Sequence, residues 1–474
     1  MIELSSNIYS YLEKHFGKAF ADNYKEYVGS EFISYLRLPA DNIQQEKIIR
    51  SLLSKGIELK KVDPLLNAFS VIKGKELIGK SLDFILGKYY IQSLSSMIPA
   101  IVLQPNENEV VLDLCAAPGS KSTQISELMN NKGTFYANES SAQRIRSLIF
   151  NLDKTNVLNM GVMQFYGELL SKYFQSYFDK VLVDAPCSGL GIVQKRGEVS
   201  NWWNEKQVMK LYETQWKLLV GAIKSAKVGA EIIYSTCTLT LEENELLINK
   251  IIQKYPLELE DINLPVLSHS AFTKYGDENL SPSLSKARRI IPWEINSEGF
   301  FICKLRKYAE SEQVNIGIIK NRGIELLSSK DKLITKLLND LNQKFGIPLD
   351  ELSKYKYINK NNDLFFVDEN WIAPNPNIFT RIGTRFGSID KYGNFILNSL
   401  SAQHFDNLIS KNIIEIENVS QVQTYMQGGT IKDITGSGQK VVKYSGYLLG
   451  TAVASKDGLK SQFPRAMRMQ QMIL

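Results

Sequence analysis

Short apolar runs alternate with amphipathic segments through the middle of the chain. Each run is the length of one buried strand, whereas the segments between the runs repeat their apolar residues at helical spacing. The segment 206–226, for example, places Val208, Leu218 and Ala222 on an inward face. The apolar runs are residues 110–114, 133–139, 156–163, 179–184, 230–235 and 299–305. This alternation predicts an α/β core in which a parallel sheet carries helices on both faces.

The N-terminal region has a different pattern. Ile8, Leu12 and Phe16 are spaced by four residues and predict a helix. A β-type run at 34–39 and a helix that begins near Asn42 follow. Together they predict a small α+β module ahead of the core.

The C-terminal third also differs from the core. Residues 308–328 have the composition of a linker, and 330–345 predict a helix. Beyond Phe379 the chain consists of short β-type runs separated by glycines. That spacing predicts a small barrel.

Composition places the chain among folded globular proteins. Its 474 residues are 44% hydrophobic and 22% charged, which excludes disordered and collagen-like classes and predicts about three domains. The formal charge of +6 permits a polyanionic partner without requiring one.

Cysteine and histidine usage predicts a reducing compartment and no metal site. The chain has three histidines, and its cysteines stand at positions 115, 187, 237 and 303, too far apart for a short-spaced zinc or redox pair. No segment reads as a signal peptide or a membrane helix. We therefore expect a cytoplasmic protein.

The first candidate site is the loop in VVLDLCAAPGSKS, residues 110–122. A buried strand ends there in small residues that lead into a helix, a position at which backbone N–H groups bind ligands in α/β sheets. The loop lacks the GxGxxG pattern, which argues against a nicotinamide dehydrogenase. Glu139 ends the next strand, 20 residues after Gly119, and is suited to accept hydrogen bonds from ribose hydroxyls.

Two further strands bring thiols to the same edge of the sheet. FDKVLVDAPCSGLG delivers Asp184 and Cys187, and AEIIYSTC delivers Cys237. A thiolate that adds to C6 of a cytosine makes C5 able to attack an activated methyl group, and a second thiol can assist product release. Asp184 can stabilise the charge that develops on the base, and Lys121 can lower the pKa of the attacking thiol. These considerations leave open which thiol attacks.

LDLCAAPGSKS, VDAPCSGLG, YSTCTLTLEENE and SEGFFICKLRK together resemble the motifs of RNA (cytosine-5) methyltransferases of the Nop/Sun/Fmu group. The resemblance covers about residues 30–307. It implies a Rossmann-like core that uses S-adenosylmethionine, with Cys237 as nucleophile and Cys187 assisting release. It also places Lys121 near the target base and Glu139 on the ribose. The cofactor positions it implies are Cys115, Ala116, Ala117, Pro118, Gly119, Ser120, Lys121, Glu139, Arg144 and Asp184.

One residue departs from the pattern of this group. After the third strand the group usually has an acidic residue near the adenine amino group, whereas this chain has Tyr166. A tyrosine can stack or hydrogen-bond, so we expect altered adenine contacts.

The C-terminal run KYSGYLLGTAVASKDGLKSQFPRAMR resembles the PUA-like extension of RsmF-type enzymes that methylate bacterial 16S ribosomal RNA. Between 440 and 474, six basic residues face one acid, Asp457. Tyr444, Tyr447 and Phe463 lie among them, as in surfaces that stack on RNA bases. We therefore expect ribosomal RNA, in a ribosomal subunit or its precursor, as the partner. Oligomeric state is left open.

The expected architecture has four parts. They are 1–105, a helical and RRM-like RNA-binding module; 106–307, the methyltransferase core; 308–378, a linker and intermediate α+β domain; and 379–474, the PUA-like domain. Two alternatives remain open: a transfer RNA cytosine-5 methyltransferase, and a catalytically silent RNA-binding or ribosome-assembly factor of the same fold. Tyr166 favours the silent factor, whereas the two thiols and Asp184 argue against it.

Overall fold

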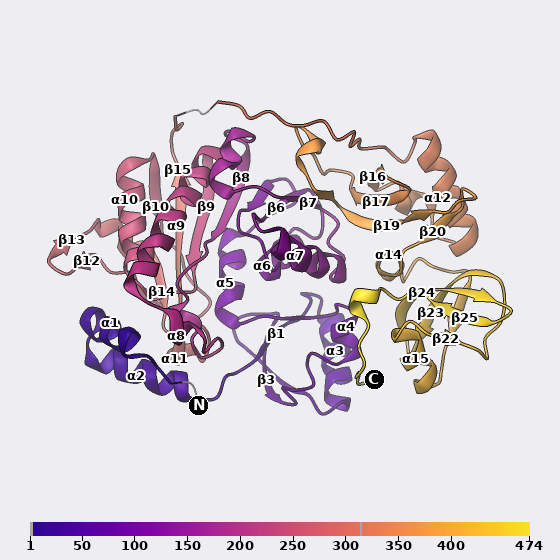
Figure 1. The fold of residues 1–474 in the computed structure, drawn as a ribbon, viewed down its shortest axis with the longest axis horizontal. Coiled ribbons are helices and arrows are strands. Elements are labelled where there is room, and N and C mark those ends of the chain that lie inside the picture. Colours follow the sequence, from indigo (N-terminus) through magenta and orange to yellow (C-terminus); the bar gives the residue numbers. More distant parts are fainter. Residues whose placement is uncertain (1–2, 313–314) are drawn as a thin grey trace.

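The computed structural model describes residues 3–312 and 315–474 and contains a large central sheet (Figure 1). The strand order is β11-β14-β15-β9-β8-β5-β6-β7-β18, and β10 pairs with β15. The parallel strands are β5 (Val110–Asp113), β6 (Thr134–Asn138), β7 (Met160–Met163), β8 (Phe178–Asp184) and β9 (Ala226–Thr236). Antiparallel neighbours are β10 (Leu257–Glu260), β11 (His269–Ser270), β14 (Arg288–Ile290), β15 (Phe300–Lys307) and β18 (Arg381–Ile382). Each of the six predicted apolar runs overlaps one of these strands, and the α/β fold class is confirmed.

Strand β7 begins later than the pattern predicts. Asn156 has a left-handed backbone with φ of 53°, and the side chain of Asn159 donates to the carbonyl of Lys132 at 2.7 Å. The first residues of the apolar run therefore form a turn, and extended pairing starts only at Met160.

Helices cover both faces of the sheet (Figure 1). Successive strand residues point to opposite faces, so Val111 packs among α5 (Leu94–Leu103), α6 (Ser120–Leu128) and α7 (Ala142–Lys154). Leu112 packs on the other side with α9 (Glu205–Ser225) and α10 (Leu247–Lys254). The predicted helix at 206–226 is thus α9. The short elements around this layer are α8 (Val199–Trp202), α11 (Pro292–Ile295), η1 (Gly167–Lys172), η2 (Leu190–Ile192), η3 (Glu242–Leu246), η4 (Pro282–Lys286), β12 (Lys274–Tyr275) and β13 (Glu278–Asn279).

The N-terminal region packs against the core in two places. Helices α1 (Ser6–Phe16) and α2 (Lys18–Gly29) pack on Leu190 and Leu239, in loops that follow β8 and β9. The other part is an antiparallel sheet of order β2-β3-β1-β4 with two helices. Its elements are β1 (Tyr35–Arg37), α3 (Asn42–Ser54), β2 (Glu58–Lys61), β3 (Ala68–Lys73), α4 (Leu82–Ile85) and β4 (Tyr90–Ile91).

The C-terminal third contains two sheets. The first, of order β16-β17-β19-β20, has as elements α12 (Lys332–Phe345), α13 (Leu349–Leu352), β16 (Tyr355–Lys360), β17 (Asp363–Asp368), η5 (Pro376–Ile378), β19 (Thr384–Ile389), β20 (Phe395–Leu397) and α14 (Ser399–His404). The second, of order β21-β23-β24-β25-β22, has β21 (Ile413–Glu415), α15 (Val419–Met426), β22 (Thr430–Ile431), β23 (Gly438–Tyr444), β24 (Tyr447–Ser455), β25 (Gly458–Ser461) and η6 (Arg465–Met467). The first sheet takes strands from both sides of the expected boundary at 378/379. The division into domains stays a prediction.

The C-terminal third is attached to the rest of the molecule in two places. Strand β18 extends the central sheet by pairing with β7, and Arg381 forms an ion pair with Asp153 at 2.6 Å. At the chain end, Ile473 forms a β-bridge with Ser81, which places the C-terminus beside the N-terminal module (Figure 1). Over residues 3–312 and 315–474 no helix combines the length and apolar character needed to cross a membrane.

Candidate functional site

A cavity of about 650 Å³ opens where β5, β6, β8 and β9 end, and we call it the thiol cavity. Eight of the predicted catalytic and cofactor-binding residues line it: Cys115, Ala117, Pro118, Glu139, Arg144, Asp184, Cys187 and Cys237. Ala116, Gly119, Ser120 and Lys121 stand behind this lining. The carboxyl ends of neighbouring parallel strands meet at one edge of the sheet, and this topology gathers the motifs.

Two thiols face each other in this cavity. Sγ of Cys187 lies 2.9 Å from Sγ of Cys237. Cys187 follows β8 and Cys237 follows β9, and the two strands are in register at Asp184 and Ser235. The hydrogen bond with Cys237 and burial together hold the pKa of Cys187 well above its ordinary value. Cys187 therefore keeps its proton at neutral pH, and the two sulfurs lie within hydrogen-bonding reach of each other.

An ion pair between the buried Lys121 and the half-buried Asp184 lies beside the thiols. Nζ of Lys121 is 2.8 Å from Oδ2 of Asp184, and Oδ1 of Asp184 accepts a hydrogen bond from Ser235 Oγ at 2.8 Å. Lys121 also donates to Ser96 Oγ at 2.9 Å and lies over the ring of Phe300. Burial by itself lowers the pKa of Lys121, but the neighbouring Asp184 carboxylate outweighs burial and the pKa is raised. The pair is thus charged and fixed in orientation.

The small-residue loop is held from behind by polar side chains. Asp113, at the end of β5, accepts a hydrogen bond from Ser122 Oγ at 2.7 Å, and burial raises the pKa of Asp113 to about 7. The buried Asn138 side chain bonds the Leu114 carbonyl and both backbone groups of Phe165 at 3.1 Å. Burial also raises the pKa of Cys115 well above its ordinary value, so this third thiol is a poor nucleophile.

At the end of β6, Glu139 and Arg144 form the wall opposite the thiols. Oε2 of Glu139 lies 3.0 Å from the Arg144 guanidinium, and Oε1 accepts from the Ser141 N–H at 2.9 Å. Glu139 is 3% exposed, and its Oε2 accepts no aligned hydrogen bond within the described residues. An acceptor of this kind, beside the cavity, is available to a hydroxyl donor of a ligand.

Tyr166 lies at the rim of the cavity and is 66% exposed. Its neighbour Phe165 packs on Tyr173 with ring centroids 4.7 Å apart. The exposed Tyr166 ring is accessible to a ligand at the rim. Contact with an adenine stays a prediction.

The structure adds side chains that the motifs did not identify. Arg196 and Thr214 line the cavity, and Ser96 and Ser235 orient the Lys121–Asp184 pair. Serines and threonines are too common for sequence alone to single them out. The cluster of acids directly after the Thr-Cys motif is a signal in the sequence that could have identified further residues of the site.

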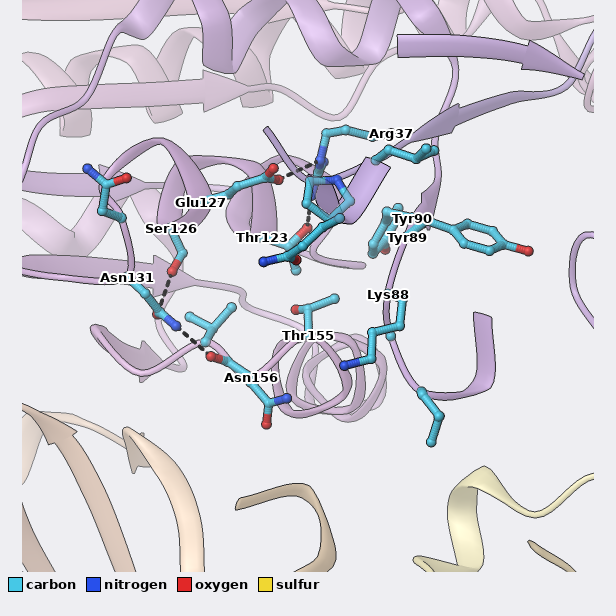
Figure 2. Close-up of a pocket in the computed structure, with 17 residues that line it drawn as sticks. Arg37, Lys88, Tyr89, Tyr90, Thr123, Ser126, Glu127, Asn131, Thr155 and Asn156 are labelled. Carbon is cyan, nitrogen blue, oxygen red and sulfur yellow. Dashed lines mark hydrogen bonds and ion pairs between the residues drawn. The ribbon is translucent and has the colours of Figure 1, made fainter. Parts of the chain in front are cut away.

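A second cavity, of about 360 Å³, separates the N-terminal module from the ends of α6 and α7 (Figure 2). Arg37 crosses it and bonds Glu127 at 3.1 Å and Thr123 at 2.9 Å, and Asn131 donates to the Asn156 carbonyl at 2.7 Å. Most of these polar groups are bonded to one another. The bonds of Arg37 therefore join the module to the core.

A parallel sheet covered on both faces, with a small-residue loop after β5 and an acid at the end of β6, defines the Rossmann-like methyltransferase class. A model of the 16S rRNA methyltransferase RsmB/F family matches residues 100–306. The chain is also 30% identical to ribosomal RNA small subunit methyltransferase F of Vibrio vulnificus, over 83% of this chain and 82% of the relative. The chain belongs to the RsmB/F family and is an S-adenosylmethionine-dependent methyltransferase.

Other relatives match either nearly the whole chain or little more than the core. The protein of the same name from Shewanella piezotolerans is 29% identical over 95% of this chain and 97% of its own length. A tRNA (cytosine(49)-C(5))-methyltransferase of Pyrococcus abyssi is 35% identical over 55% of this chain and 84% of its own. The crystal structure of a methyltransferase homolog protein from Pyrococcus horikoshii aligns with a TM-score of 0.56 at 29% identity, covering 63% of this chain and 93% of that chain.

The residues around the cavity fit this cofactor. The open Oε2 of Glu139 suits a ribose hydroxyl, and the accessible Tyr166 ring suits a flat base. Cys115, Ala117 and Pro118 of the small-residue loop line the same space. Bound there, S-adenosylmethionine supplies an electrophilic methyl group.

Proposed function

We propose that the chain methylates C5 of a cytosine in 16S ribosomal RNA by way of a covalent Cys–C6 adduct. The observation that carries this proposal is the thiol pair, with sulfurs 2.9 Å apart, beside the Lys121–Asp184 ion pair in one cavity. C5 of cytosine is a weak nucleophile until C6 carries an added thiolate, so the reaction requires a thiol at this place.

In this proposal Cys237 is the nucleophile. The raised pKa of Cys187 keeps that thiol protonated and makes it a poor nucleophile, and its sulfur stands beside that of Cys237. Its Sγ–C6 bond forms first, C5 then takes the methyl group, and loss of the C5 proton allows the Sγ–C6 bond to break. Cys187 stands close enough to assist this release.

Lys121 and Asp184 hold the base in this proposal. The Asp184 carboxylate lines the cavity and can accept from the exocyclic amine of cytosine, and Lys121 fixes that carboxylate. A fixed pair costs little reorganisation when charge develops on the ring.

The cofactor lies along the loop of Cys115, Ala116, Ala117, Pro118, Gly119, Ser120 and Lys121. Glu139 accepts from its ribose, and Arg144 and Asp184 complete the wall. The support is that most of these residues line one cavity and that Glu139 retains an open acceptor.

Ribosomal rather than transfer RNA is proposed from the C-terminal third. The relatives named for the small ribosomal subunit match over 82–95% of the chain, whereas the relative named above for tRNA matches over 55%. In this proposal, 1–105 and a PUA-like 379–474 bind RNA on either side of the core 106–307, with 308–378 between them. The substrate would be presented in a ribosomal subunit or its precursor.

The test is methyl transfer from labelled S-adenosylmethionine to purified small ribosomal subunits, naked 16S RNA and transfer RNA. We expect label in 16S RNA, recovered as 5-methylcytosine after digestion. Label in transfer RNA alone would show that transfer RNA, and not 16S RNA, is the substrate. Binding of RNA with no transfer to any of the three would favour the silent factor.

A further inference from the structure

A π-helical turn, η3, follows the Thr-Cys motif directly and bonds to both thiol loops. Insertions of this kind in helices are frequent at functional sites. Asn244 bonds Thr236 at 2.7 Å and the Thr238 carbonyl at 3.1 Å, which fixes the residues on either side of Cys237. The preceding residue, Glu243, faces the other thiol loop.

The Glu243 carboxylate is fully buried and accepts four hydrogen bonds. Oε1 accepts from Ser188 N–H at 2.9 Å and Gln215 Nε2 at 2.7 Å. Oε2 accepts from Thr240 Oγ1 at 2.7 Å and from Ser188 Oγ. Ser188 follows Cys187, and Thr240 lies three residues after Cys237, so one side chain spans both loops.

Gln215 extends the same connection. Its Nε2 also donates to the Pro186 carbonyl at 2.9 Å. The segment from Pro186 to Ser188, which contains Cys187, is therefore bonded on either side of the thiol to Glu243 or to its partner. A buried carboxylate that loses its donors is strongly disfavoured. The four bonds therefore hold the two loops in a fixed position relative to each other.

We propose that Glu243 is a positioning residue that holds the Pro186–Ser188 loop against the Thr236–Thr240 loop and thereby sets the distance between the two thiols. Its carboxylate is sealed from the thiol cavity, so it acts through Cys187 and Cys237 and contacts neither substrate nor cofactor. The effect of Glu243 on methyl transfer rests on the proposed function. Its effect on the distance between the two thiols does not.

The geometry is tested with phenylarsine oxide, which bridges two close thiols. Two S–As bonds form, and the oxygen leaves as water with the two thiol protons. We expect intact-mass analysis to detect one bridged arsenic in the unmodified protein and none in Cys187→Ala. Glu243→Gln should slow bridging about tenfold or more, because an amide cannot accept all four donors.

Catalysis is measured on the same proteins. We expect Glu243→Gln to lower kcat by about 10²-fold, the scale for reacting groups misplaced by about 1 Å, with KM for RNA within twofold. Glu242→Gln is the matched control, because the neighbouring Glu242 is also buried but bonds Tyr11 and Tyr275, outside both thiol loops. It should resemble the unmodified protein in both assays.

If Glu243→Gln fails to fold, Ser188→Ala tests the same connection, because it removes one bond to Oε2 and leaves the backbone N–H in place. It should shift bridging and kcat in the same direction by a smaller factor. Unchanged bridging in a folded Glu243→Gln protein would overturn the positioning role even if methylation is observed. Slowed bridging would support it even if no RNA were methylated.

Discussion

Cys187 and Cys237 stand side by side, and the proposed mechanism gives them different roles. The contact with Cys237 and burial raise the pKa of Cys187, which keeps that thiol protonated. The sequence alone allowed either thiol to attack. The contact between the two sulfurs therefore adds a physical reason for the proposed order.

We expect Cys237→Ala to lower methyl transfer by about 10³-fold or more, since the adduct cannot form. Cys187→Ala should still add to the base but release it slowly, and so accumulate protein covalently bound to RNA. Denaturing gels with labelled RNA distinguish the two. Cys303→Ala is the control, because that thiol is buried on β15 away from the cavity. Adduct accumulation in Cys237→Ala would reverse the assignment.

At the scale of elements, the strand-to-helix connection after β5 depends on a buried acid. Asp113 ends the strand, and Ser122 in the first turn of α6 donates to it at 2.7 Å. Burial is the main reason that the pKa of Asp113 rises to about 7. The native protein therefore binds a proton that the unfolded chain has released above about pH 4.

The contribution of Asp113 to the stability of the protein depends on pH. Since the native state binds more protons between about pH 4 and 7, the contribution of Asp113 to stability falls as pH rises through that window and is constant above it. Asp113→Asn should remove this slope and gain about 2–3 kcal/mol relative to the unmodified protein between pH 5 and pH 8. Urea unfolding at both pH values measures it, with exposed Asp277→Asn as control. Parallel pH curves for Asp113→Asn and the unmodified protein would refute it.

A second junction of elements lies between the loops after β8 and β9. The Gly191 N–H donates to the Cys237 carbonyl at 2.9 Å, and its carbonyl accepts from Gly299 N–H at 2.9 Å. A Cβ at Gly191 would lie 2.0 Å from the Gly299 oxygen. Only glycine allows this close approach, which joins the Pro-Cys, Thr-Cys and SEGFF motifs into one wall.

At the scale of the whole molecule, charge and aromatic residues in the C-terminal sheet separate into two groups. Phe463 is buried, Tyr447 bonds Asp83 of the N-terminal module at 2.8 Å, and Lys443 pairs with Asp406 at 2.7 Å. The expected stacking surface therefore loses Phe463, which packs in the core of that sheet. Lys456 and Lys460, on the β24–β25 hairpin, remain exposed.

If this hairpin binds RNA as proposed, Lys456→Gln with Lys460→Gln should weaken binding of 16S RNA about tenfold. The slope of log K against log salt concentration should become smaller by about one to two. Filter binding at several salt concentrations measures both. Lys354→Gln is the control, because Glu351 already pairs with that ammonium at 2.7 Å. An unchanged salt slope would place the RNA elsewhere.

Much of the core was predictable because its signals are local. A run such as 179–184 contains its own strand pattern, and strand ends in a parallel sheet gather at one edge, so the positions of Asp184, Cys187 and Cys237 followed from the sequence. Glu243 did not follow, because its partners at 188 and 215 are far away in the chain. The boundary at 378/379 crosses a sheet for the same reason: pairing of β17 with β19 spans it.

The sequence by itself thus determined the α/β class, the motifs and the chemistry of the side chains at the sheet edge, since these depend on residue type and periodicity. Tertiary structure decided that the two sulfurs lie 2.9 Å apart, how Lys121 is held by Asp184, and that Phe463 is buried. It also decided that β18 extends the central sheet. These features depend on contacts between residues distant in the chain, and their geometry is set only when the elements pack together.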